Sequence, residues 1–112
     1  MIEDERTRKI IQTIIKHCNI IEDTMEYFEK EDFNSNLIFQ NAILTPVTQI
    51  GELVKKLSEE FREKYSEIPW RNIAGMRDIV VHGYETIDKK ILWNVAKVEI
   101  PKLKTFCLKI LK

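Results

Sequence analysis

The chain has 112 residues, of which 44% are hydrophobic and 32% charged, and its 18 basic residues balance its 18 acidic ones. This length allows one packed core, so we expect a single domain spanning residues 1–112. The composition excludes a disordered chain, and three Gly and three Pro leave little room for the turns of a β-sandwich. The absence of net charge means that no global field attracts nucleic acid.

The sequence also bears on location. No apolar run approaches the roughly 20 residues of a membrane span, and Met1–Arg6 is too acidic and polar for a signal peptide. We therefore expect a cytoplasmic protein without a membrane anchor. Cys18 and Cys107 stand in apolar helical settings near opposite ends of the chain, which favours two buried, reduced thiols over a disulfide.

The charges are unevenly distributed along the chain. Residues 22–32 contain six acids and one lysine, whereas residues 89–112 contain seven lysines and one acid. A solvated helix face is the ordinary explanation for each run. The lysine-rich run would also let a C-terminal helix flank a phosphate-binding cleft.

The first predicted helix begins after Asp4, a suitable N-cap. Its apolar positions recur at steps of three and four, as in a packed bundle: Ile11, Ile14, Cys18, Ile21, Met25 and Phe28. Turn and cap residues break the pattern at residues 32–36. A second helix then runs to about Lys56. Pro46 should kink this helix, and Gly51 indicates close approach of a neighbouring helix.

Ser58 is expected to cap a short third helix through Tyr65, and residues 66–69 form a connector. The fourth predicted helix starts near Trp70. Its inward-facing positions are Ile73, Met76, Ile79 and Val80. Gly83 is expected to end it, because glycine readily takes the left-handed conformation found at helix ends.

Asp88 is expected to cap the last helix, with Ile87 and Leu92 as a hydrophobic staple and a distortion at Pro101. Its apolar face consists of Leu92, Val95, Leu103, Phe106 and Ile110. The pattern as a whole predicts an all-α fold, an up-and-down bundle of four main helices plus one short helix.

The segment from Arg77 to Tyr84 carries the candidate chemistry. Arg77 offers a fixed positive fork for a phosphate, and His82 can exchange a proton near neutral pH. On an ideal helix Asp78 and His82 share a face, so the carboxylate would orient the imidazole. Arg77 and His82 would lie about 140° apart. They converge only if the helix ends near His82 or a second subunit closes the gap.

A structural explanation of the same residues stays open. In it, Arg77 and Asp78 are surface charges, His82 interacts with the helix dipole at a C-terminus, and Tyr84 packs on the end of the bundle.

A longer pattern distinguishes the two explanations. The chain reads Ile68-Pro69-Trp70-Arg71-x-Ile73-x-Gly75-Met76-Arg77-Asp78-x-x-Val81-His82-x-Tyr84, followed by Ile87-Asp88. This pattern resembles the HepT-like family of HEPN domains, and Arg77, Asp78, His82 and Tyr84 all match its motif. The resemblance covers about residues 41–111 and is weakest over the first helix.

The resemblance implies an all-helical homodimer that acts as the toxin of a two-gene toxin–antitoxin system. It implies metal-independent cleavage of RNA without a cofactor, at a site shared across the dimer. In this interpretation His82 is the general acid or base, Arg77 binds the scissile phosphate, Asp78 holds the tautomer of His82, and Tyr84 contacts the phosphate. The implied antitoxin is an MNT-type nucleotidyltransferase that silences the toxin by adenylylating Tyr84. In the alternative, the chain is a non-catalytic docking partner that presents Tyr84 to that nucleotidyltransferase.

Other candidate sites are weaker. His17 beside Cys18 has no accompanying ligand cluster, so a pair at the edge of the core is favoured over a metal site. Trp70 and Trp93 can stack a base, but burial against the bundle is the simpler use. Glu52 is expected to be buried near Gly51, paired with an arginine.

Overall fold

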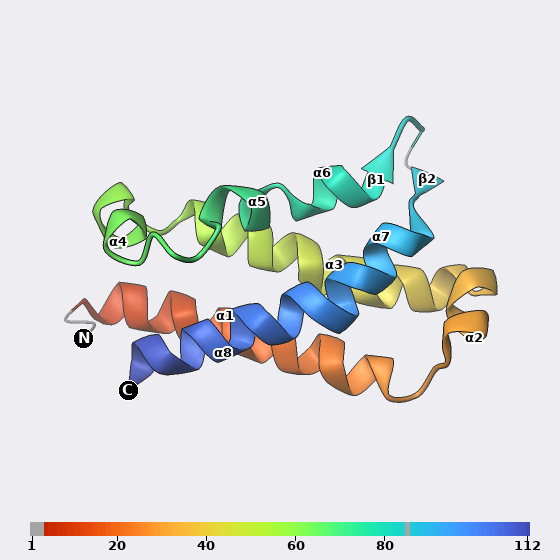
Figure 1. Cartoon of the computed structure of the whole chain (residues 1–112), viewed down its shortest axis with the longest axis horizontal. Coiled ribbons are helices and arrows are strands. Elements are labelled where there is room, and N and C mark those ends of the chain that lie inside the picture. The colour runs from red at the N-terminus through yellow and green to blue at the C-terminus, as the bar shows by residue number, and fades with distance from the viewer. Residues whose placement is uncertain (1–3, 85) are drawn as a thin grey trace.

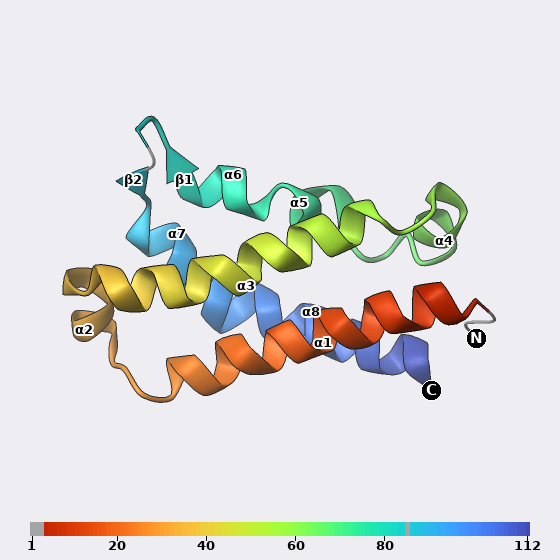
Figure 2. The ribbon, with the colours of Figure 1, turned by 180° about the vertical axis from the view of Figure 1, so that it is seen from behind.

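The computed structural model describes residues 4–84 and 86–112, so Met1–Glu3 and Glu85 lie outside the described part. It is an all-α bundle, as expected, in which three long helical stretches run along the longest axis (Figure 1). These stretches are α1 (Glu5–Met25), α3 (Leu37–Lys55) and the continuous run of α7 (Lys89–Asn94), the π-helical turn η1 (Val95–Glu99) and α8 (Ile100–Leu111). Helix α1 packs along both α3 and α8, and Figure 2 shows the first pair from behind.

Helix α1 follows the sequence prediction closely. Asp4 caps it by accepting a hydrogen bond from the backbone N–H of Arg6 at 3.0 Å. The predicted apolar face is buried from Ile11 to Met25, while Phe28 lies beyond the end of the helix. Both thiols are free and buried, and burial raises the pKa of Cys18 and that of Cys107 to about 12.

A short helix, α2 (Lys30–Ser35), occupies part of the region where only turn residues were expected. Glu29 and Asp32 form a capping box that satisfies its first N–H groups. Phe33 is fully buried and contacts the rings of Phe39 and Trp93 edge-on, which fixes α2 against α3 and α7. This segment has too few apolar residues to show a helical period in the sequence.

Helix α3 is capped by Asn36, whose side chain accepts a hydrogen bond from the N–H of Phe39. Pro46 lies inside α3 without ending it. A Cβ atom on Gly51 would lie only 2.9 Å from the carbonyl oxygen of Ala74, so the predicted close approach is confirmed. The expectation for Glu52 was wrong: it is exposed and pairs with Lys55 at 2.7 Å.

Ser58 caps α4 (Glu59–Lys64) as predicted, accepting from the N–H of Phe61. The single fourth helix was not predicted correctly. It consists of two short helices, α5 (Trp70–Ala74) and α6 (Met76–Val80), which break at Gly75 and lie along α3.

Helix α6 ends before the position expected for it. Val81 already has extended backbone angles, so the helix stops at Val80 and Gly83 belongs to a loop beyond it. The early end also changes which residues are buried. Val80 is fully buried as expected, but Ile79 is 48% exposed.

The last helical run matches its predicted caps. Asp88 accepts from the N–H of Ile91 at 3.0 Å, Leu92 is buried, and Ile87 packs against the core. The distortion expected near Pro101 is the π-helical turn η1, in which the N–H of Ile100 bonds to the carbonyl of Val95. Within the described residues, no helix is both long and apolar enough to cross a membrane.

The contact at Gly51 gives a test of how α5 is held. Gly51→Ala should destabilise the fold by about 1–3 kcal/mol through overpacking against the backbone of α5, although alanine is the better helix former by about 1 kcal/mol. Urea unfolding measures the difference. Gly75→Ala is the matched control, because its Cβ atom would lie 3.6 Å from the nearest backbone oxygen. If the two variants are equally stable, the tight contact between α3 and α5 does not exist.

Candidate functional site

The predicted site residues lie around a small hairpin between α6 and α7, drawn at one end of the molecule in Figure 1. Its strands are β1 (Val81–His82) and β2 (Thr86–Ile87), paired antiparallel with Val81 opposite Ile87 and His82 opposite Thr86. Val81 and Ile87 pack against the core. Because successive side chains of a strand point to opposite faces, His82 turns outward.

Arg77 lies on α6, where its guanidinium is 3.6 Å from the carboxylate of Asp78. Asp78 is largely exposed. The pKa of Lys55 on α3 is raised mainly by its hydrogen bond to Glu52, and the charge of Asp78 adds to this effect. Asp78 therefore lies among cations.

His82 is about half exposed and its Nε2 atom lies 3.8 Å from Oδ2 of Asp88. The expected pairing of His82 with Asp78 assumed a continuous helix, and this assumption is wrong because α6 ends at Val80. The carboxylate at ion-pair distance from His82 is that of Asp88. Sequence reasoning recognised Asp88 only as a helix cap, because strands of two residues give no readable period.

Tyr84 follows Gly83 in the hairpin loop and its side chain is fully exposed. Gly83 has a φ of +53°, a conformation that suits glycine and helps the chain reverse. The structural explanation in which Tyr84 packs on the bundle end is therefore wrong. Lys89 and Lys90, both exposed, come directly after Asp88 and place positive charge beside the hairpin.

The other candidates lie elsewhere. His17 is on α1, and its pKa is lowered from 6.5, mainly because burial disfavours the imidazolium and also through Lys16. Trp70 is buried as expected, and its indole N–H donates to the carbonyl of Tyr65. Trp93 is half buried against Phe33. Among residues 4–84 and 86–112, no group of three or more His, Cys, Asp or Glu side chains is placed to hold a metal ion.

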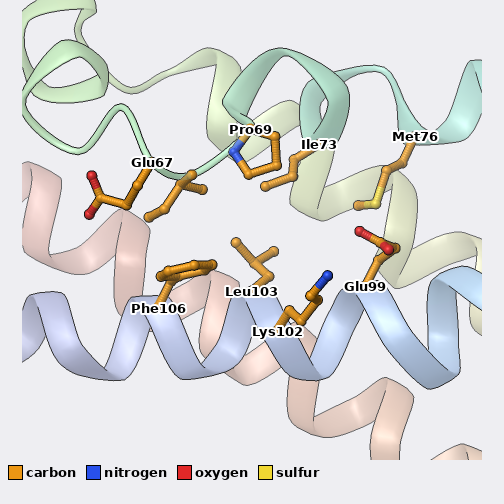
Figure 3. A pocket seen from close by; sticks show the side chains of 9 residues that line it. Glu67, Pro69, Ile73, Met76, Glu99, Lys102, Leu103 and Phe106 are labelled. Atoms are coloured by element: carbon orange, nitrogen blue, oxygen red, sulfur yellow. The ribbon is translucent and has the colours of Figure 1, made fainter.

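A cavity of about 210 Å³ lies between the α5–α6 segment and α8 (Figure 3). Ile73 and Met76 face Leu103 and Phe106 across it. Neither Arg77, His82 nor Tyr84 lines this cavity, so it is separate from the candidate site.

Comparison with known proteins identifies the family. The model of a family described as ribonuclease HepT-like matches residues 14–110, a range that includes Arg77, Asp78, His82 and Tyr84. The chain belongs to the HepT-like ribonuclease family. It is 34% identical over 94 residues to "Probable ribonuclease HepT" of Thermococcus cleftensis, covering 84% of this chain and 86% of that protein.

Two further relatives extend this comparison. "Putative RNase TTE0752" of Caldanaerobacter subterraneus is 36% identical over 96 residues, covering 86% of each chain. "Gamma-glutamylcyclotransferase and putative RNase MJ0434" of Methanocaldococcus jannaschii is 39% identical over 99 residues, which are 88% of this chain but only 45% of that longer protein. No solved structure matches the chain.

Proposed function

We propose that this protein is an endoribonuclease that cleaves RNA without a metal ion, using Arg77 and His82. The observation that carries the proposal is that both side chains are accessible on either side of the α6–β1 junction, within the segment matched by the HepT-like model. Arg77 binds the scissile phosphate and stabilises its developing charge. His82 transfers the proton, as general base or general acid.

The chemistry suits a site with so few groups. RNA carries its own nucleophile in the 2′-hydroxyl, so the protein need only move a proton, hold the phosphate and assist the leaving 5′-oxygen. The products are a 2′,3′-cyclic phosphate, or its hydrolysis product, and a 5′-hydroxyl. Lys89 and Lys90 add local attraction for the RNA backbone, which the neutral chain as a whole lacks.

The family resemblance adds a biological role to this proposal. We infer that the protein is the toxin of a toxin–antitoxin pair whose antitoxin is an MNT-type nucleotidyltransferase. One observation favours the alternative, a non-catalytic docking partner: the fully exposed Tyr84 suits presentation to another enzyme whether or not RNA is cleaved.

Arg77→Ala and His82→Ala should each lower cleavage of an RNA oligonucleotide by about 10²–10⁴-fold, the usual contribution of such groups. EDTA should leave the wild-type rate unchanged, and end-group analysis should find the cyclic phosphate. Arg71→Ala and His17→Gln are matched controls, since Arg71 is an exposed arginine on α5 and His17 lies on α1.

Expression of the chain alone in a bacterial host separates the two roles. Growth arrest that Arg77→Ala or His82→Ala relieves supports the toxin, whereas normal growth with stable protein supports the docking partner. Full activity of His82→Ala, or loss of cleavage in EDTA alone, would contradict the mechanism.

We also propose a homodimer whose two-fold axis brings the α6–β1 segments of both chains to one cleft. Exposed apolar residues on the relevant elements support it, namely Ile79 on α6 and Leu108 on α8. Leu108 is one of three apolar positions, with Val81 and Ile91, that the sequence leaves available for an interface. Val81 and Ile91 pack partly against the core of their own chain.

Sedimentation equilibrium at micromolar concentration should find a dimer. Ile79→Gln should dissociate it because a polar amide replaces an interface contact, while Ile38→Gln, at an exposed position of α3, should not. Mixing the inactive Arg77→Ala and His82→Ala proteins should restore part of the activity if each site combines residues of both chains. A monomeric wild-type protein would exclude the shared site.

A further prediction concerns Tyr84. Adding AMP to its hydroxyl would place a phosphodiester beside Arg77 and His82, where it competes for the cations that would bind RNA. Incubation with ATP, magnesium and the proposed MNT-type nucleotidyltransferase should raise the mass by one or more AMP units and stop cleavage. Tyr84→Phe should block the gain, whereas Tyr27→Phe, which removes another exposed hydroxyl, should not. Unchanged labelling of Tyr84→Phe would refute the assignment.

A further inference from the structure

The hairpin brings Asp88 to the same side as His82. Val81 and Ile87 face each other and pack against the core, so the alternate positions His82 and Thr86 face outward. Asp88 follows Ile87 with extended backbone angles and returns to the outward side. It is therefore the diagonal neighbour of His82 across the two strands, a distance that longer side chains span.

Asp88 is fixed by two hydrogen bonds, one of its backbone and one of its carboxylate. Its backbone N–H donates to the carbonyl of Val80 at 2.7 Å, which extends the ladder past the Val81–Ile87 pair. Its Oδ1 atom accepts from the N–H of Ile91 at 3.0 Å and so caps α7. The second oxygen, Oδ2, is the one that lies 3.8 Å from Nε2 of His82.

The contact between His82 and Asp88 is longer than a hydrogen bond, which needs about 2.7–3.2 Å. We expect rotation of the half-exposed imidazole to close the difference, because the carboxylate is held by its bond to Ile91. Catalytic hydrogen bonds are commonly long in the absence of substrate.

We propose that Asp88 is the positioning residue of His82: Oδ1 caps α7 while Oδ2 holds the proton of the neutral imidazole on Nε2, leaving Nδ1 to face the RNA. A carboxylate accepts hydrogen bonds and donates none, so it selects the tautomer that carries its proton on the facing nitrogen. The predicted orientation of His82 can be tested whether or not the protein cleaves RNA. Its use in cleavage rests on the proposed ribonuclease function.

Asp88→Asn tests the assignment with little change in shape. Asparagine caps helices as well as aspartate does, so its amide oxygen keeps the bond to Ile91. Its NH₂ group then faces His82 and donates, which moves the imidazole proton to Nδ1. Long-range ¹H–¹⁵N spectra at alkaline pH should report Nε2–H for His82 in the wild type and Nδ1–H in the variant. The signals of His17, the only other histidine, should not change.

Two further variants distinguish an effect on the His82 tautomer from a general loss of stability. Asp4→Asn makes the same change at the cap of α1 and should leave the His82 spectrum unaltered. Asp88→Ser keeps a capping oxygen but removes the carboxylate, so the Nε2–H fraction of His82 should fall to that of a free imidazole while α7 stays intact, as unfolding curves would verify. It provides the test if the asparagine variant folds poorly.

Kinetics supply the link to function. With RNA, Asp88→Asn should lower kcat at least about tenfold with KM little changed, because the imidazole presents the wrong nitrogen. A wild-type Nδ1–H tautomer, or identical tautomers in wild type and Asp88→Asn, would overturn the proposal even if cleavage is robust. A wild type that shows the predicted tautomer but cleaves no RNA would instead refute the ribonuclease function alone.

Discussion

The hydrogen bond from the N–H of Asp88 to the carbonyl of Val80 joins the end of α6 to the start of α7, and the arrangement of the site follows from it. It closes a hairpin too short to be stable by itself, since isolated two-stranded pairs are marginal in water. Val81 and Ile87 anchor the closed hairpin on the core. His82 and Tyr84 are left outside, on a segment whose two ends are both tied to helices.

Those two helices are held in place by α3. Helix α5 approaches it backbone to backbone at Gly51, and both α6 and α7 contact it. Phe33 adds a link by placing its buried ring between those of Phe39 and Trp93, which belong to α3 and α7. The helix with Arg77 and the helix capped by Asp88 thus share one support, which limits how far the ends of the hairpin can separate.

The long helices were predictable because each carries an apolar face over several turns, and their caps at Asp4, Ser58 and Asp88 were readable from residue type. Other short elements were not predictable. A capped helix of six residues and strands of two give no period to count, so α2 and the hairpin were missed. The break at Gly75 divided a helix that the spacing of Ile73, Met76 and Val80 made appear continuous.

The same limit applied to the candidate site. Its residue types at Arg77, His82 and Tyr84 were readable because the family motif is local in sequence, and all three side chains prove accessible. The carboxylate facing His82 was not, because helical spacing selected Asp78. The contact joins His82 and Asp88, which are six residues apart in the sequence. It forms only because the chain reverses direction between them. The available sequence signal of that reversal was a β-branched residue on each side of Gly83, namely Val81 and Thr86.

The open position of the site determines how it can be controlled. The chain has no net charge, so no global field attracts an RNA strand, and the 210 Å³ cavity is not lined by the candidate site residues. In the proposed function, binding draws on a few cations, chiefly Arg77, Lys89 and Lys90. Where so few charges carry the interaction, adding one phosphodiester at an exposed side chain changes a large share of it. In the proposed function Tyr84 therefore needs no buried contact to be an effective switch, because its exposure makes it accessible and it lies two residues from His82 in the same hairpin.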